Sequence, residues 1–331
     1  MSELPKLVIY FLWDGARRDV LEQTPLPVLD SMKKNALWVD KVTTALPSLS
    51  GTGKNTLRTG TWTKSHGTVV QGQDTYWDRE KRELRVYDFH KSPPGINHYF
   101  REAGYYTADF DFCMVELLRQ QNFPKHKADY AENYWVNPKG FECASKSFYT
   151  VERWMDAHLA ELLKTRNVLL SLELASPDNT AHKYGVKGEA YKMAVTFADT
   201  LTGMLLDKVG KLGALSDTMV IVASDHGELD VETTVSIDEV ANVLKSADIG
   251  YAHLFNSGRY GMVYLDDEEL KDRTIKAIGS LPWIDKVDLA QAFKMDHPYV
   301  GDVVFFVKKD YAFSKGPGDH GGARPEETQV G

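Results

Sequence analysis

Three apolar runs in this chain each lead toward an aspartate, and this pattern constrains the fold more than any other feature of the sequence. Asp14 follows the run 7–13, Asp178 follows the run 168–174, and Asp225 follows the run 219–223. Short apolar runs of this length are typical of buried strands. Because ligands in open α/β sheets bind beyond the carboxyl ends of the strands, we expect the three carboxylates to meet at one edge of a sheet.

Strand-like and helical segments alternate along the rest of the chain. This alternation predicts an α/β fold with a mainly parallel central sheet and helices on both faces. Two amphipathic runs, at 145–164 and 188–212, are expected to form long helices. The other expected elements are helices at 27–32 and 96–102 and strands at 38–42 and 107–112. A chain of 331 residues is long enough to bury a large core of this kind.

Residues 228–300 differ in character from the rest of the chain. Helix, strand, helix and strand are expected there in turn, at 238–246, 259–265, 267–281 and 284–289. This order predicts a small α+β insert, and the apolar run 301–307 indicates a return to the main sheet. We therefore predict a core of residues 1–227 and 301–331, with the insert 228–300 as a candidate cap over the active site.

Bulk composition limits the classes of partner. The net charge of −8 argues against a nucleic-acid-binding protein, which normally has a basic face. No apolar stretch approaches the roughly 20 residues that span a bilayer, and the N-terminus leaves no room for a secretory signal before the first strand. Two cysteines form no disulfide framework. We expect a cytoplasmic protein that binds neither nucleic acid nor membrane; its oligomeric state is not readable.

Histidines accompany two of the three aspartates. Asp178 and His182 are four residues apart, a spacing that puts both side chains on one face of a helix, as in paired-histidine zinc sites. A capped helix start with an incidental histidine is the alternative, since an aspartate after a proline also signals a helix start. Asp225 and His226 close an apolar strand, and the following glycine permits a turn through which both could reach one ion.

A third histidine, His320, lies in the glycine-rich segment 316–322, for which a flexible surface loop is the alternative. Each motif is common when it stands alone. Together they favour a shared site, because independent coincidences at the ends of successive strands are improbable. Three aspartates, three histidines and one serine can hold two metal ions, so the sequence predicts a metal-dependent hydrolase.

Ser50 is the candidate nucleophile. We expect it at a loop-to-helix junction within the segment 46–60, where a helix N-terminus favours an alkoxide or a bound anion. A free hydroxyl is a weak nucleophile, and direct coordination to a metal would activate it. The segment does not match the phosphate-binding loop of nucleoside-triphosphate switches, because Lys54 is followed by Asn55 rather than by serine or threonine.

Taken together, these segments resemble the alkaline phosphatase superfamily. Within it they are most similar to the type I phosphodiesterase/nucleotide pyrophosphatase group and its relative, phosphonoacetate hydrolase. The resemblance runs from Val8 to about Ala323. Its motifs lie at 14–15, 47–50, 57–60, 65–67, 177–185, 224–227 and 320–321.

The resemblance implies a ligand set and a mechanism. One ion would be held by Asp14, Ser50, Asp225 and His226, and the other by Asp178, His182 and His320. Ser50 would attack phosphorus and form a phospho-enzyme intermediate, while the two ions clamp the attacking and leaving oxygens of an in-line displacement. Zinc suits aspartate and histidine ligands at such a site, with manganese as the alternative metal. The substrate is expected to be a small phosphorylated molecule.

Three departures from the family pattern bear on the substrate. The diesterase branch usually has a threonine nucleophile where this chain has Ser50, and an asparagine that donates to a phosphoryl oxygen where this chain has Gln71. Phosphonoacetate hydrolase has a Lys-x-Lys pair where this chain has Asp109 and Asp111. These aspartates would repel a substrate carboxylate and could face a cationic or polyhydroxylated leaving group. Solvated acids at a strand end are the alternative.

The expected activity is thus phosphodiester hydrolysis. Phosphomonoester or phosphonate hydrolysis is the alternative within the same superfamily, and a metal-binding protein without turnover is the alternative from another class. Lys54 falls where sulfatases keep an arginine and is a candidate substrate contact, although the sulfatase signal for formylglycine formation is absent from the segment.

Overall fold

A parallel sheet of four strands forms the centre of the protein, in the order β5-β6-β1-β7. The computed structural model describes residues 4–39, 42–69, 75–86, 93–110 and 141–330. The four strands are β1 (Leu7–Trp13), β5 (Tyr106–Phe110), β6 (Val168–Leu174) and β7 (Thr218–Ala223). β1 lies between β6 and β7 and runs parallel to both. The predicted α/β class and the parallel sheet are therefore confirmed.

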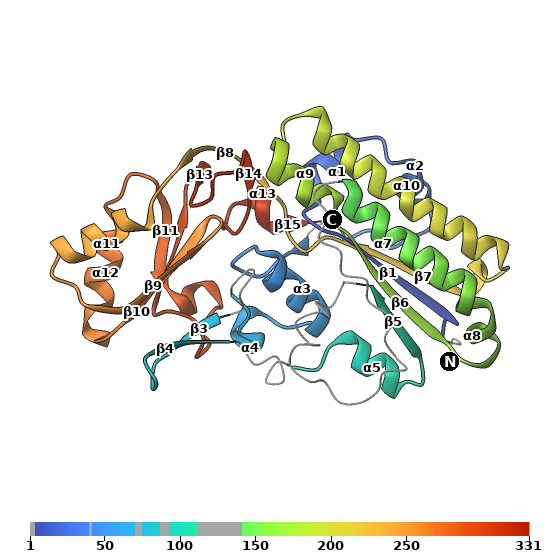
Figure 1. The fold of residues 1–331 in the computed structure, drawn as a ribbon, viewed down its shortest axis with the longest axis horizontal. Helices are drawn as coiled ribbons and strands as arrows, with labels where there is room; N and C mark the ends of the chain where they lie inside the picture. Colours follow the sequence, from blue (N-terminus) through green and yellow to red (C-terminus); the bar gives the residue numbers. More distant parts are fainter. Residues whose placement is uncertain (1–3, 40–41, 70–74, 87–92, 111–140, 331) are drawn as a thin grey trace.

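Helices cover both faces of this sheet (Figure 1). One face carries α7 (Phe141–Trp154), α9 (Ser176–Tyr184) and α10 (Glu189–Lys211), with α1 (Arg18–Gln23) and α2 (Pro27–Lys33) beside them. A π-helical turn, Met155–Leu159, joins α7 to α8 (Ala160–Thr165), so the run expected at 145–164 is helical throughout. The other face carries α3 (Ser50–Thr59) and α5 (Ile96–Glu102), with α4 (Thr63–His66) after α3.

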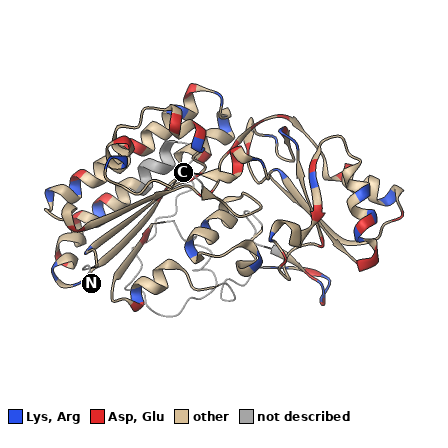
Figure 2. Ribbon diagram, turned by 180° about the vertical axis from the view of Figure 1, so that it is seen from behind, with Lys and Arg blue, Asp and Glu red and all other residues tan. Residues whose placement is uncertain are grey.

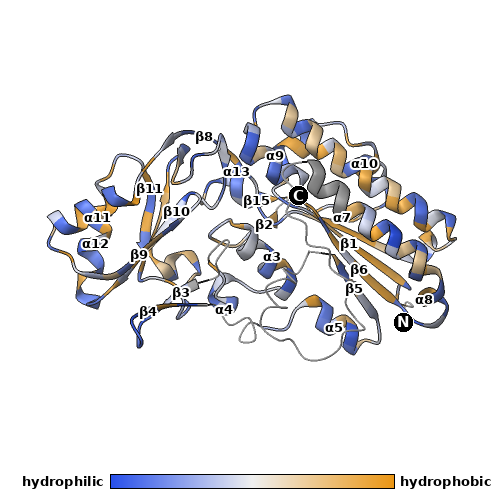
Figure 3. Cartoon of the chain, in the orientation of Figure 1, coloured by the Kyte–Doolittle hydropathy of each residue, from blue (hydrophilic) through white to orange (hydrophobic). Residues whose placement is uncertain are grey.

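The central strand β1 is apolar throughout because its alternate side chains enter two different cores. Phe11 and Trp13 belong to the large core beneath the long helices. Tyr10 and Leu12 instead pack with Leu57 of α3 and with other side chains on the opposite face. Figure 3 shows the resulting contrast between the hydrophobic strands and the hydrophilic outer sides of the helices.

A second sheet is antiparallel and has the order β11-β12-β10-β9. Its strands are β9 (Tyr251–Ser257), β10 (Tyr260–Leu265), β11 (Ile284–Leu289) and β12 (Val303–Val307), and α11 (Ile237–Ser246) and α12 (Lys271–Gly279) pack against it. The helices and strands expected between 238 and 289 are therefore present. In Figure 1 this sheet and its helices lie beside the parallel sheet.

The expectation that 301–307 returns to the main sheet is wrong, because β12 pairs with β10 and β11. Phe305 packs in the cluster formed with α11 and α12, whereas Phe306 packs in a second cluster on the other face. A central antiparallel strand covered on both faces is as uniformly apolar as a parallel one, so hydropathy does not distinguish them. The antiparallel sheet thus extends beyond residue 300, and the domain division at 228–300 stays a prediction.

Short strands connect the two sheets to the rest of the chain. β8 (Leu229–Thr234) pairs with β13 (Asp310–Ala312) and β14 (Gly318–Asp319), and β2 (Val42–Thr43) pairs with β15 (Gln329–Val330) after α13 (Pro325–Thr328). β3 (Thr75–Asp78) and β4 (Glu83–Val86) form a hairpin. Of the strand expected at 38–42, Trp38 and Val39 are not in a strand, Val42 is, and residues 40–41 lie outside the described residues.

Basic and acidic residues are interspersed along the helices (Figure 2). Within the described ranges, every helix is too short or too polar to span a bilayer.

A buried ion pair joins the antiparallel sheet to the C-terminal segment. The Arg259 side chain is fully buried, and its Nε donates to Glu327 Oε1 at 3.0 Å while Nη2 donates to the Lys308 carbonyl at 2.9 Å. The same Glu327 oxygen accepts from the Gly322 N–H at 2.7 Å. The Arg259 N–H donates to the His320 carbonyl at 3.0 Å. This pair therefore fixes the chain on both sides of His320.

Replacing Arg259 by alanine should lower the free energy of unfolding by about 3–5 kcal/mol, because it leaves the buried Glu327 carboxylate without its cation. Arg324→Ala is the control: Arg324 pairs with Asp285 but its side chain is 37% exposed, so we expect a loss of about 0–1 kcal/mol. Urea unfolding measures both. An equal decrease in the free energy of unfolding in the two variants would contradict a buried Arg259–Glu327 ion pair. The double variant Arg259→Met with Glu327→Leu should lose less of this free energy than Arg259→Ala does.

His66 holds α3 against the segment that follows α4. Its buried ring accepts a hydrogen bond at Nδ1 from the Thr68 N–H at 3.1 Å, and its Nε2 lies 3.1 Å from the Thr56 hydroxyl. Since Nδ1 accepts, the ring is neutral. Burial, with a smaller contribution from the charge of Arg58, lowers the pKa of His66 from 6.5 to about 3.

This lowered pKa should make the protein less stable in acid. Between pH 6.5 and about 3 the unfolded chain binds a proton at His66 and the folded chain does not. The free energy of unfolding therefore decreases as the pH is lowered, by about 2 kcal/mol at about pH 5. We expect the urea midpoint of His66→Gln to depend less steeply on pH between about 7 and 5. The partly exposed His98 supplies a control, His98→Gln, which should keep the wild-type slope. A wild-type slope in His66→Gln would refute this account.

Candidate metal centre

The three predicted aspartates converge at the carboxyl ends of the parallel strands. Asp14 directly follows β1, Asp225 follows β7, and Asp178 lies in the first turn of α9 after β6. Gly15 allows the close approach of two of these strand ends, since it has φ +69° and a side chain there would meet Asp178 Cα at 2.9 Å. The α/β topology expected from the apolar runs thus places the carboxylates together.

Each of the three predicted histidines is oriented by a backbone carbonyl. Nδ1 lies 3.0 Å from the Gly227 oxygen in His226, 3.1 Å from the Gly318 oxygen in His182, and 2.9 Å from the Ser48 oxygen in His320. A carbonyl can only accept, so Nδ1 carries the proton and the lone pair of the neutral ring is on Nε2. Metal-binding histidines are commonly oriented in this way.

The ligand atoms of these residues form two adjoining groups. The first group is Asp14, Asp225 and His226, and the second is Asp178, His182, Glu228 and His320; within each group the atoms lie within 4.8 Å of one another. Asp178 Oδ1 of the second group is 3.9 Å from His226 Nε2 of the first. The structure therefore brings together all six predicted aspartate and histidine ligands and adds Glu228 to them.

Several buried atoms in these groups have no hydrogen-bond partner among the described residues. They are Asp14 Oδ1, Asp178 Oδ1, Asp225 Oδ2, both carboxylate oxygens of Glu228, and His320 Nε2. Buried polar atoms are normally paired, and cations bound between these oxygen and nitrogen atoms would supply the missing partners. The residues therefore fit a centre for divalent metal ions.

Negative charge accumulates in this small volume. Burial and the nearby Asp14 carboxylate together raise the pKa of Asp225 to about 7. Burial also raises the pKa of Glu228, with Asp178 adding to the rise. Burial lowers the pKa of His226, but the Asp225 and Asp14 carboxylates outweigh it and raise this pKa to about 10. Protons neutralise the excess charge in the metal-free protein, and bound cations would displace them.

Ser50 begins α3, as the sequence predicts, and its hydroxyl reaches the first group. Ser50 Oγ lies 2.9 Å from His226 Nε2. The absence of a side chain at Gly53 allows this approach, because a Cβ there would lie 2.3 Å from the Asp225 carbonyl oxygen. The helix that bears Ser50 is thus packed directly against the loop that bears Asp225.

Lys54 is buried one turn after Ser50 and pairs with two carboxylates. Its Nζ lies 2.8 Å from Asp14 Oδ2 and 2.9 Å from Glu173 Oε1. Lys54 therefore holds one Asp14 oxygen away from the metal groups and leaves the other facing His226 Nε2 at 3.2 Å. Glu173 was not among the predicted site residues, although it is the one acidic residue in the apolar run 168–174.

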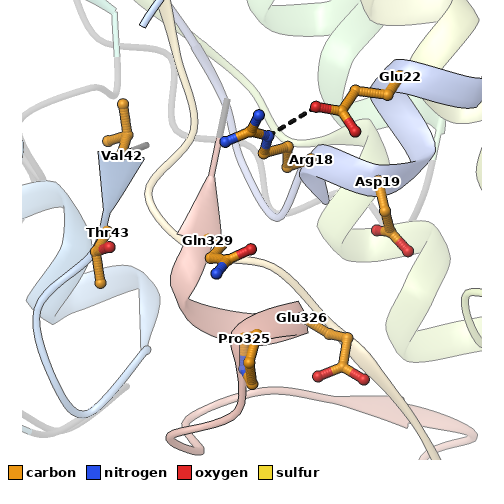
Figure 4. A pocket seen from close by; sticks show the side chains of 8 residues that line it. All are labelled: Arg18, Asp19, Glu22, Val42, Thr43, Pro325, Glu326 and Gln329. Atoms are coloured by element: carbon orange, nitrogen blue, oxygen red, sulfur yellow. Dashed lines mark hydrogen bonds and ion pairs between the residues drawn. The ribbon is translucent and has the colours of Figure 1, made fainter. Parts of the chain in front are cut away.

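The remaining predicted residues lie elsewhere. Asp109 is buried in β5, where it accepts a hydrogen bond from Asn97 at 2.6 Å, and it belongs to neither metal group. Gln71 and Asp111 lie outside the described residues. A separate surface pocket of about 490 Å³ lies between α1 and the segment 325–329, and none of the predicted ligands lines it (Figure 4).

Glu228 joins the site through a pairing that local sequence does not reveal. β14 pairs with β8 in antiparallel register, with Asp319 opposite Leu229, so the next residues along are His320 and Glu228. The one feature of the sequence that could have pointed to Glu228 is its position directly after the predicted ligand segment 224–227.

Comparisons with known proteins identify the family of this chain. A family model described as type I phosphodiesterase / nucleotide pyrophosphatase matches residues 8–329. The chain is 24% identical over 242 residues to mouse ectonucleotide pyrophosphatase/phosphodiesterase family member 7, a match that covers 68% of this chain and 50% of that protein. It is 21% identical over 271 residues to human bis(5'-adenosyl)-triphosphatase, covering 77% of this chain and 54% of that protein. The chain thus spans about half the length of these curated relatives.

Solved structures share the fold over nearly the whole chain. Murine ectonucleotide pyrophosphatase/phosphodiesterase 5, in an inactive form in complex with AMP, matches with a TM-score of 0.74 at 19% identity, covering 99% of this chain and 87% of that one. Phosphonoacetate hydrolase from Sinorhizobium meliloti matches with a TM-score of 0.70 at 16% identity, covering 98% and 89%. Since the family model covers almost the entire chain, this protein belongs to the type I phosphodiesterase/nucleotide pyrophosphatase family.

Proposed function

We propose that this protein is a metal-dependent hydrolase of small phosphate diesters that uses Ser50 as its nucleophile. The observation that carries the proposal is the position of the Ser50 hydroxyl, 2.9 Å from His226 Nε2 in the first ligand group. Family membership supports phosphoric ester hydrolysis as the reaction class. The names of the relatives, and the AMP bound to one structural neighbour, favour a nucleotide-type diester as the first substrate to test.

The donor chemistry supports two divalent ions, with zinc as the first choice and manganese as the alternative. Asp14, Ser50, Asp225 and His226 would hold one ion, and Asp178, His182 and His320 the other. When bound, such ions act as Lewis acids on a phosphoryl oxygen and lower the pKa of a coordinated hydroxyl. The two cysteines of the chain are consistent with the cytoplasmic location that we include in the proposal.

The residues of the chain then carry the reaction in two steps. Ser50 Oγ attacks phosphorus, the bond from phosphorus to the leaving-group oxygen breaks, and a phosphoserine forms. Water next attacks the same phosphorus, and the bond to Ser50 Oγ breaks to restore the hydroxyl. The N-terminus of α3 favours negative charge on Ser50 Oγ in both steps. Lys54 positions Asp14 rather than contacting the substrate.

Ser50→Ala should lower turnover of bis(p-nitrophenyl) phosphate by roughly 1,000-fold or more, because alanine lacks the hydroxyl that attacks phosphorus. Metal content should be retained, since six ligands remain. Ser50→Thr is the matched control and should keep measurable activity, because threonine has the same hydroxyl. Undiminished turnover in Ser50→Ala would exclude Ser50 as the nucleophile. A wild-type preference for p-nitrophenyl phosphate would instead indicate a monoesterase, and inactivity on both esters would favour a phosphonate substrate or a protein without turnover.

Lys54→Gln should weaken metal binding at the first group by about 10- to 100-fold, because it frees the Asp14 carboxylate that Lys54 orients. At saturating metal the KM for the diester should stay near the wild-type value. Metal titration and steady-state kinetics on one preparation measure both effects. Normal metal affinity with a raised KM would contradict the positioning role and would assign Lys54 to substrate binding.

A further inference from the structure

We propose that Glu228 is a metal ligand, so that the second group holds its ion with two carboxylates and two imidazoles. The inference rests on the proposed two-metal centre and deepens it. Glu228 was not part of the ligand set implied by the sequence, which assigned three residues to this ion. The added carboxylate changes both the coordination of the ion and the charge of the whole centre.

The backbone around Glu228 is held on both sides. The Gly227 N–H donates to the Glu327 carbonyl at 2.8 Å, and the Glu228 carbonyl accepts from Arg17 Nη1 at 3.2 Å. On the next residue, Leu229 pairs with Asp319 in the β8–β14 ladder. The direction of the Glu228 side chain is therefore set by the fold rather than by a flexible loop.

The side chain itself is aimed at the second group and has no other partner. Glu228 is fully buried, and neither carboxylate oxygen has a hydrogen-bond partner among the described residues. Its Oε1 lies 3.9 Å from His320 Nε2 and 4.0 Å from His182 Nε2. Ligand atoms bound about 2.0–2.2 Å from one ion lie roughly 3–4 Å from one another, and these separations agree with that spacing. An ion there gives the buried carboxylate the partner that it lacks.

A neutral Glu228 that shares a proton with Asp178 is the competing account. In that case the side chain would fill space beside the ligands without coordinating. The two accounts differ in what a glutamine does at this position. Glutamine has the size of a protonated glutamate and keeps a hydrogen-bond donor, but it lacks the negative charge that a metal ligand supplies.

Coordination by Glu228 has a consequence for the metal. Four protein ligands complete a tetrahedral zinc shell, whereas a catalytic ion must keep a position for substrate. The second ion must therefore accept five or six ligands. Manganese readily does so with mixed oxygen and nitrogen donors.

Coordination by Glu228 also has a consequence for the choice of substrate. With ions bound, Asp14, Asp178, Asp225 and Glu228 together carry four negative charges, which balance the charges of two divalent ions. The loaded centre is then neutral before substrate binds. A neutral centre attracts a dianionic monoester less than a centre with a surplus positive charge does. We therefore infer selectivity for monoanionic diesters.

Metal titration of the full-length, metal-free protein tests the ligand role. With a chelating dye as competitor, wild type should bind two ions each of Zn²⁺ and Mn²⁺, and Glu228→Gln should weaken one of the two sites by at least about 10- to 100-fold. Glu228→Asp, which keeps the charge, should recover part of the loss. Glu232→Gln is the control, because Glu232 lies in β8, the strand directly after Glu228 in the chain, but is 64% exposed and pairs with Lys187. Unfolding of each metal-free variant in urea verifies that it folds.

The outcomes separate this inference from the proposed function. Two unchanged sites in Glu228→Gln overturn the ligand role and leave the Ser50 mechanism intact. Fewer than two sites in the wild type overturn the two-metal centre itself, and with it the inference. At saturating metal, Glu228→Gln should shift the ratio of monoester to diester turnover toward the monoester by at least about tenfold, because it restores one surplus positive charge. An unchanged ratio with a weakened site overturns the selectivity.

Discussion

The structure depends on placing four buried carboxylates in one small volume at the edge of a parallel sheet. Removing a carboxylate from water is costly unless a cation or hydrogen-bond donors replace the water. Here the protein supplies only part of that compensation, through Lys54 on Asp14 and through backbone N–H groups on Asp225. Within the described part of the chain, oxygens without a hydrogen-bond partner remain on Asp14, Asp178, Asp225 and Glu228. The fold around the site is therefore arranged to receive positive charge.

The two ligand groups rely on different parts of the fold. The first group comes from the ends of β1 and β7, and Ser50 reaches it from helix α3, which covers the parallel sheet. The second group takes Asp178 and His182 from α9, but it takes Glu228 and His320 from the β8–β14 pair. His320 is additionally fixed from the antiparallel sheet, through the N–H of Arg259. The second sheet thus contributes to the site although none of its four strands contains a ligand.

Local sequence was sufficient for the parts of this arrangement that depend on strand ends. The apolar runs before Asp14, Asp178 and Asp225 set the strands, and the topology of a parallel sheet brings their ends together. The four-residue spacing of Asp178 and His182 likewise follows from helix geometry. Residues whose position depends on long-range pairing were not predictable. Glu228 meets His320 only through the register of the β8–β14 pair. The strand β12 was assigned to the wrong sheet because the hydropathy of a strand does not indicate which strands pair with it.

The spread of the ligands along the chain bears on how the protein unfolds. The second group joins Asp178 and His182, on the parallel-sheet side, to Glu228 and His320, which are held by β8 and β14. An ion bound by all four would close chain loops of roughly fifty and ninety residues, and closing such loops removes conformational entropy from the unfolded ensemble. The ion would then act as a cross-link between α9, beside the parallel sheet, and the β8–β14 pair. With it in place these two parts of the protein should unfold in one cooperative transition, and after chelation each is free to unfold separately.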